Sequence, residues 1–168
     1  MKTDYYATIY ASPLDELTLE SDGDSLTGLY FTYPPGEEEP EGDEGDSLPI
    51  FDQARRWLDC YFSGQMPDFT PPLRPEGSPF YLRVWEILRT IPFGETTTYG
   101  AIAQRIARER GIPKMAAQAV GRAVGANPIA LIIPCHRVVG ANGDLTGYAG
   151  GLFRKARLLD LEQYGDII

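Results

Sequence analysis

Histidine and cysteine are scarce in this sequence, and their scarcity excludes several kinds of chemistry. The 168 residues contain one histidine, His136, and two cysteines, Cys60 and Cys135, which most of the chain separates. Two distant cysteines do not form the disulfide framework of a small secreted protein. One histidine and two unclustered cysteines cannot supply the four ligands of a usual zinc site, and a zinc deaminase would need another cysteine soon after Cys135. We therefore expect neither a metal nor a cofactor.

Long hydrophobic runs are also missing. No stretch has the length and apolarity of a transmembrane helix, although 43% of the residues are hydrophobic and can supply a core. Residues 1–5 lack the charged and then apolar pattern of a secretory signal. The expected compartment is therefore the reducing cytoplasm, and we expect a monomer with no membrane partner.

Positive charge is sparse in the first half of the chain. Residues 1–78 contain 4 Lys or Arg against 17 Asp or Glu, whereas residues 79–168 contain 11 against 7. The overall net charge of −9 argues against a nucleic-acid partner, but the positive second half could present a basic face to one. Much of the acid lies in residues 34–47, which cannot bury apolar surface and are predicted to form a solvated loop.

The first part of the chain, residues 1–75, is predicted to be a small α/β domain. Aromatic and β-branched residues at 5–10 and alternating patterns at 14–20 and 26–31 indicate a small antiparallel sheet. Apolar residues at helical spacing then predict a helix over residues 50–62.

The second part, residues 78–168, is predicted to be helical. Residues 63–79 carry five prolines and two glycines, so they form a connection rather than a helix. Ser78-Pro79 then provides an N-cap and a proline at the first helical position. A last helix is expected over residues 152–164.

Two neighbouring helices in this part are candidates for a DNA-binding motif. Thr98 can cap a helix over residues 99–110, and a Gly-Ile-Pro break at 111–113 precedes a helix over 114–125. An ordinary αα-hairpin and a helix-turn-helix both fit this pattern. The second helix consists almost wholly of small residues, which permit close approach of a backbone to DNA and favour the helix-turn-helix.

The single histidine directly follows a cysteine in the most informative segment, Ile-Ile-Pro-Cys-His-Arg-Val-Val at residues 132–139. A thiol attacks only as a thiolate, and a free thiol has a pKa of about 8.5. His136 and Arg137 offer a proton acceptor and a positive charge beside Cys135. A buried structural cysteine is the alternative, and it is our interpretation of Cys60 in the helix over residues 50–62.

The cysteine segment belongs to a series of spaced motifs: Phe-Gly-Glu-Thr-Thr-Thr-Tyr at 93–99, Ala-Val-Gly at 119–121, Asn-Pro at 127–128, Pro-Cys-His-Arg-Val at 134–138 and Gly-Tyr-Ala-Gly-Gly at 147–151. In order and separation, the series resembles the methylated-DNA–protein-cysteine methyltransferases, also called O6-alkylguanine-DNA alkyltransferases. The resemblance is close over residues 78–165 and extends to the first third of the chain in general layout.

The resemblance implies a fold and a function. The N-terminal α/β domain would hold a three-stranded ribonuclease-H-like sheet plus a helix, and an all-α winged helix-turn-helix domain would follow. The function implied is DNA repair in a single turnover. An alkyl group on O6 of guanine in double-stranded DNA moves irreversibly to Cys135, with O4 of alkylthymine as a further candidate substrate. Because the target base is stacked, it must be flipped into a pocket.

The resemblance also implies catalytic roles. Cys135 would be the acceptor nucleophile, His136 would act as its base through a water, and Glu162 would orient the imidazole and stabilise the imidazolium. Asn127 would tie the DNA-binding helix to the active-site turn. Tyr99 would donate a hydrogen bond or a proton to guanine as it leaves.

Further residues would bind the substrate by the same resemblance. Lys155 would support the tyrosine. The backbone carbonyls of Cys135 and Val138 would read the guanine amino group, and the backbone amide of Ala149 would contact the guanine oxygen. Tyr148 would form a wall of the pocket.

The helix of small residues, which includes Ala117 and Gly121, would dock in the minor groove, and Arg137 is a further candidate for a substrate or DNA contact. Two departures from the family pattern stand out. Gln118 occupies a position where family members often have an arginine that fills the gap left by the flipped base, so flipping is expected to be weaker or to be assisted by another residue. Ala149 stands where some members have a serine, with little expected effect.

Two other functions remain open at this point. The first is a sensor that binds alkylguanine without removing the alkyl group, but such proteins replace the cysteine, which is present here. The second is a cysteine hydrolase, which would leave the two candidate DNA-binding helices unexplained.

Overall fold

Three antiparallel strands open the chain in a computed structural model that describes residues 4–32, 43–44 and 48–166. β1 (Tyr6–Ala11), β2 (Glu16–Ser21) and β3 (Leu26–Phe31) pair in the order of the sequence, as predicted. A two-residue strand, β4 (Asp43–Glu44), adds a parallel neighbour to β1. The rest of the predicted acidic loop lies outside the described residues.

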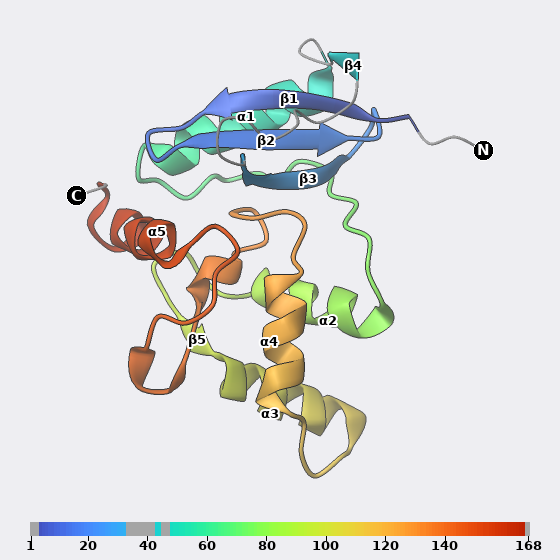
Figure 1. The fold of residues 1–168 in the computed structure, drawn as a ribbon, viewed down its shortest axis with the longest axis vertical. Coiled ribbons are helices and arrows are strands. Elements are labelled where there is room, and N and C mark those ends of the chain that lie inside the picture. The colour runs from blue at the N-terminus through green and yellow to red at the C-terminus, as the bar shows by residue number, and fades with distance from the viewer. Residues whose placement is uncertain (1–3, 33–42, 45–47, 167–168) are drawn as a thin grey trace.

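The helix α1 (Pro49–Phe62) covers one face of this sheet (Figure 1). Its position confirms the helix predicted over residues 50–62. Phe51 and Leu58 on α1 are fully buried, as are Leu17 and Leu19 on β2. Burying such side chains supplies about 1.5–3 kcal/mol each, so this apolar layer is a main source of stability for the first part of the chain.

The second part of the chain is built on four helices: α2 (Pro79–Leu88), α3 (Tyr99–Arg110), α4 (Ala117–Gly125) and α5 (Leu152–Tyr164). Both predicted N-caps are confirmed, because Ser78 accepts a hydrogen bond from the amide of Tyr81 and Thr98 accepts one from the amide of Ala101. None of the helices in the described part of the chain is long and apolar enough to cross a membrane.

α3 and α4 pack against each other as a helix-turn-helix (Figure 1). The predicted boundary between them was partly wrong. The second helix begins at Ala117 rather than at residue 114, so the connection spans residues 111–116. A helix that began at residue 114 would have Pro113 as its N-cap, and proline has no side-chain oxygen to accept from the first amides, which favours a later start.

The second domain is helical, as predicted, and it also contains one short pair of strands. Thr97–Thr98 (β5) and Val138–Val139 (β6) form a short parallel pair. All four residues are β-branched, which favours extended backbone over helix at these positions. This pair joins the start of α3 to the segment that follows Cys135.

The edge of the sheet holds the two parts of the chain together. The amide of Leu29 on β3 donates to the carbonyl of Pro128 over 2.9 Å, and the carbonyl of Leu29 accepts from the amide of Ala130 over 2.8 Å. Leu26, on the same strand, pairs in the same way with residues 72–74 of the connection. The edge strand therefore fixes the segment between α4 and Cys135.

Two glycines of the helix-turn-helix allow a stability test. Gly111 ends α3 with a φ of +64°, whereas Gly125, the last residue of α4, keeps a negative φ, and a Cβ would meet no atom within 4 Å at either position. Gly111→Ala should lower the free energy of unfolding by about 1–2 kcal/mol, because an L-residue is strained in the left-handed region. Gly125→Ala should raise it by up to about 1 kcal/mol. Denaturant unfolding of both variants checks the pair. Equal effects would contradict the assignment of the left-handed cap.

Candidate active site

A short, tightly turned segment, residues 126–134, connects the end of α4 to the buried Cys135. Asn127 follows α4, and its side-chain amide donates to the carbonyl of Ile133 over 2.8 Å, while its oxygen accepts from the amide of Ile129 over 3.0 Å. Leu131, buried between them, has a φ of +69°, which is unusual for a bulky residue. Asn127 thus closes the turn that leads to Cys135.

Cys135 begins a short 3-10 helix, η1 (Cys135–Arg137), and opens onto a pocket of about 250 Å³. The pocket brings together four of the predicted site residues, because Asn127, Tyr148 and Ala149 line it beside the cysteine. Its other walls come from β3, from the end of α4 and from the loops on either side, namely Tyr30, Phe31, Val124, Gly125, Pro128, Ala130, Gly147 and Gly150.

The wall from β3 packs closely against the glycine-rich loop before α5. A Cβ on Gly150 would come within 2.6 Å of the Tyr148 ring and 2.9 Å of the Phe31 ring, so only glycine fits there. The guanidinium of Arg154 lies 4.6 Å from the Phe31 ring centroid and donates to the carbonyl of Gly150 over 3.1 Å and to Asp15 over 2.9 Å. These contacts tie the glycine-rich loop to the sheet.

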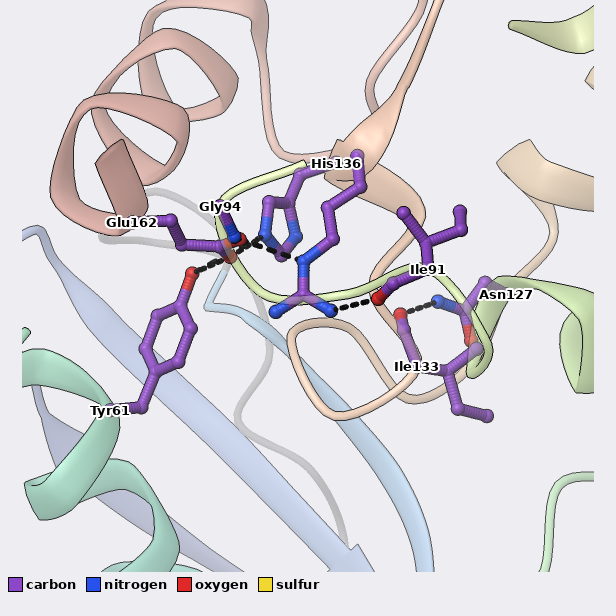
Figure 2. Close-up of polar contacts among 8 residues, drawn as sticks. Tyr61, Ile91, Gly94, Asn127, Ile133, His136 and Glu162 are labelled. Atoms are coloured by element: carbon purple, nitrogen blue, oxygen red, sulfur yellow. Dashed lines mark hydrogen bonds and ion pairs between the residues drawn. The ribbon is translucent and has the colours of Figure 1, made fainter. Parts of the chain in front are cut away.

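Behind the cysteine, one buried carboxylate gathers donors from several elements (Figure 2). One oxygen of Glu162, Oε2, contacts Nε2 of His136 and accepts from the hydroxyl of Tyr61 over 2.7 Å. The other, Oε1, accepts from Nε of Arg137 over 2.7 Å and from the amide of Gly94 over 3.0 Å. The predicted pairing of His136 with Glu162 is therefore present in the structure.

The charge states of this pair follow from its surroundings. Burial alone would raise the pKa of Glu162, but the hydrogen bonds and charges of His136 and Arg137 outweigh it and lower that pKa to about 2. Burial lowers the pKa of His136, and the neighbouring carboxylate offsets this only in part. At neutral pH the pair is a carboxylate and a neutral imidazole. Nδ1 of His136 is buried and has no hydrogen-bond partner among the described residues.

The thiol of Cys135 is a protonated group at rest. Burial raises its pKa, and a hydrogen bond from Asn127 and the charge of Lys155 oppose that shift without cancelling it. A thiol in this state needs a proton acceptor before it can attack. The neighbouring imidazole has a free nitrogen for that purpose.

Tyr99 and Lys155 meet at one backbone carbonyl beside the pocket. The hydroxyl of Tyr99, the first residue of α3, donates to the carbonyl of Thr146 over 3.1 Å, and Nζ of Lys155 donates to the same oxygen over 2.8 Å. Lys155 is fully buried and also donates to the carbonyl of Val138 over 2.6 Å. The structure thus brings together the three predicted residues Tyr99, Lys155 and Val138.

Three predicted contacts lie on the helix-turn-helix outside the pocket. Ala117 and Gln118 are exposed near the start of α4, and Gly121 approaches the Tyr99 ring, where a Cβ would be 3.9 Å away. Their exposure leaves this face of α4 open to a partner. At the other end of α4, its last residue Gly125 lines the pocket, as does Asn127 two residues later. One helix therefore runs from the exposed face to the pocket that holds Cys135.

Arg137 does not take the predicted place beside the substrate. Its guanidinium is buried, and besides the Glu162 contact it donates to the carbonyl of Ile91 over 2.7 Å. Because η1 turns the chain, Arg137 projects away from the pocket that Cys135 lines. The expected DNA contact at Arg137 is therefore replaced by an internal ion pair.

Sequence reasoning missed two groups at the site, Tyr61 on α1 and the wall formed by Tyr30 and Phe31 on β3. All three lie in the part of the chain that was predicted to be a small α/β domain, and no local motif marks them. In the described ranges, no group of three or more His, Cys, Asp or Glu side chains could hold a metal ion.

Comparison with known proteins identifies the family. The model of the 6-O-methylguanine DNA methyltransferase ribonuclease-like domain matches residues 5–75, and the model of the DNA-binding domain of the same family matches residues 79–164. Methylated-DNA–protein-cysteine methyltransferases from Haemophilus influenzae and Methanosarcina acetivorans are 44% and 46% identical to this chain. The matches cover 96% and 94% of this chain and 88% and 97% of those relatives.

A solved structure agrees with this assignment. The crystal structure of Mycobacterium tuberculosis OGT in complex with DNA superimposes with a TM-score of 0.80 at 42% identity, covering 97% of this chain and 94% of that one. The family assignment rests on two family models that together span most of the chain and on relatives of this identity and coverage. The chain belongs to the 6-O-methylguanine DNA methyltransferase family.

Proposed function

We propose that this protein repairs double-stranded DNA by moving an alkyl group from O6 of guanine to the sulfur of Cys135, once per molecule. One observation carries the proposal: the thiol of Cys135 and the end of the second helix of a helix-turn-helix, at Val124 and Gly125, line the same pocket. A base flipped out of DNA that is docked on α4 would enter this pocket beside the sulfur.

The proposed chemistry uses the residues behind the pocket. The proton of the Cys135 thiol passes to Nδ1 of His136 through a water, and Glu162 stabilises the resulting imidazolium. The thiolate then attacks the alkyl carbon, so that a sulfur–carbon bond forms as the carbon–oxygen bond breaks. The electron pair stays on guanine, to which Tyr99 donates a hydrogen bond or a proton. Lys155 holds the carbonyl that positions the tyrosine.

The two parts of the chain have separate tasks in this proposal. Residues 78–168 form the DNA-binding and acceptor domain, and residues 1–75 form an α/β domain that braces it. A cytoplasmic location fits the chemistry, because both Cys60 and Cys135 are free thiols and the acceptor must stay reduced.

Transfer can be tested directly by mass. After incubation with duplex DNA that carries methylguanine, the intact protein should gain one methyl group in place of a hydrogen, and a peptide map should place it on Cys135. Cys135→Ala should gain nothing, while Cys60→Ala should react like the parent protein. DNA binding without any change in mass would instead indicate a damage sensor. An acyl-enzyme formed with an ester substrate would indicate a hydrolase.

Gln118 gives a second test, because it is exposed on α4 and stands, by the family resemblance, at the position expected to fill the gap left by a flipped base. Gln118→Arg should raise the transfer rate on duplex DNA and leave the rate on free methylguanine unchanged, since only the duplex requires flipping. Gln65→Arg adds the same charge at an exposed position away from α4 and serves as the control. Equal gains in both variants would assign the effect to net charge, and no gain would place the gap-filling residue elsewhere.

A further inference from the structure

The side chain of Tyr61, on α1 of the N-terminal domain, extends to the buried carboxylate of Glu162 behind Cys135. Tyr61 lies in the last turn of α1, its side chain is fully buried, and Figure 2 shows its hydroxyl directed at Glu162 and His136. The hydroxyl donates to Oε2 of Glu162 over 2.7 Å and lies 3.3 Å from Nε2 of His136. None of the roles considered above uses this group.

Packing holds the Tyr61 ring in one place. The ring stacks on Trp57 with centroids 5.2 Å apart, and it makes T-shaped contacts with the rings of Phe62 and Phe93, whose centroids lie 5.3 and 6.0 Å away. Such aromatic contacts add to the free energy of burial and fix the orientation of the ring. These contacts fix the position of the Tyr61 hydroxyl, so the carboxylate of Glu162 is oriented by the tyrosine.

Counting protons at this contact fixes the form of the imidazole. An ionised carboxylate can only accept hydrogen bonds, so the proton between Glu162 and His136 must lie on Nε2. The one hydroxyl proton of Tyr61 points at Oε2, so the phenolic oxygen faces Nε2 as an acceptor as well. Both neighbours thus require a protonated Nε2, and a neutral imidazole must then carry its lone pair on Nδ1.

We infer that Tyr61 is a positioning residue for alkyl transfer: its hydroxyl holds the Glu162 carboxylate against His136 and selects the tautomer whose Nδ1 can take the thiol proton. This inference rests on the proposed transfer to Cys135. It gives the N-terminal domain a direct part in the chemistry, because α1 supplies the group that sets the base.

Other charged and titratable groups also face the imidazole and the acid, and their effects must be held constant in a test. Burial raises the pKa of Tyr61 well above its ordinary value, and the charge of Glu162 adds to this, so the hydroxyl remains a donor over the whole pH range of an assay. In the described part of the chain, the charges of Arg137 and Lys155 act on the imidazole and Tyr148 acts on Tyr61, while Cys135 precedes the histidine in η1.

The first test uses the fact that the chain has a single histidine, so its NMR signals belong to His136 alone. In the unaltered protein at neutral pH, the nitrogen chemical shifts should show a proton on Nε2 and a bare Nδ1. A proton on Nδ1 would overturn the inference, whether or not any variant folds. In Tyr61→Phe the titration midpoint of the histidine should move downward, because the imidazolium loses the phenolic oxygen and the firmly held carboxylate that stabilise its charge.

The second test measures single-turnover transfer from methylguanine in duplex DNA as a function of pH. Tyr61→Phe should slow transfer about tenfold, the factor that corresponds to one net hydrogen bond. Its pH midpoint should move in the same direction as the NMR midpoint, with DNA affinity unchanged. Tyr10→Phe is the matched control, because Tyr10 also donates to a carboxylate on α1, Asp59, over 2.5 Å, but away from the site.

The outcomes separate the inference from the proposed function. An unaltered rate and an unaltered histidine titration in folded Tyr61→Phe would overturn the inference and leave alkyl transfer intact. A slower rate in both variants, with no shift of either midpoint, would also overturn it and assign Tyr61 to packing alone. If the unaltered protein takes up no methyl group at all, the proposed function fails, while the NMR titration still reports whether Tyr61 controls His136.

Discussion

The site depends on one buried negative charge, the carboxylate of Glu162. Moving a carboxylate out of water costs several kcal/mol unless hydrogen bonds and opposite charge replace the lost hydration. Four donors do so here: His136, Arg137, Tyr61 and the amide of Gly94. They come from η1, from α1 and from the loop after α2, so the acid on α5 links segments that lie far apart in the sequence. Removing any one of them would leave the charge less well compensated.

A second constraint fixes where the thiol stands relative to α4. Leu29 pairs with the backbone at Pro128 and Ala130, and Asn127 closes the turn to Ile133. Backbone hydrogen bonds to a sheet edge are rigid and directional. The sheet edge therefore holds the segment from Asn127 to Cys135 in place at the end of the helix-turn-helix. This arrangement accounts for the presence of an α/β domain in a protein whose proposed chemistry lies in the other domain.

Local features of the fold could be predicted from the sequence, whereas contacts across the chain could not. The caps at Ser78 and Thr98 depend on residues three positions away, so the sequence pattern predicted both correctly. Tyr61 lies 75 residues from His136 and 101 from Glu162. Nothing in the amphipathic pattern of α1 separates its hydroxyl from that of any other core tyrosine.

Motif adjacency was informative for His136 and misleading for Arg137. The family resemblance implied the pairing of His136 with Glu162, but the motif could not say where the next side chain would point. In a 3-10 helix, successive side chains turn through about 120° because there are three residues per turn. Arg137 accordingly leaves the pocket and joins the ion pair behind it. A positive charge next to a cysteine in the sequence is thus no guarantee of a positive charge next to its sulfur.

The resting state of the thiol is consistent with an acceptor that is used once. Burial raises the pKa of Cys135, so the sulfur stays protonated until a proton acceptor is engaged. A permanent thiolate would react faster, but thiolates are also the form that oxidants attack. An enzyme that turns over can lose a few molecules to oxidation, whereas each loss here would remove one whole repair event. Because the thiol is neutral, Cys135 stays intact until an alkylated guanine enters the pocket. His136 is then ready to accept the thiol proton, since Tyr61 and Glu162 keep its imidazole in the required tautomer.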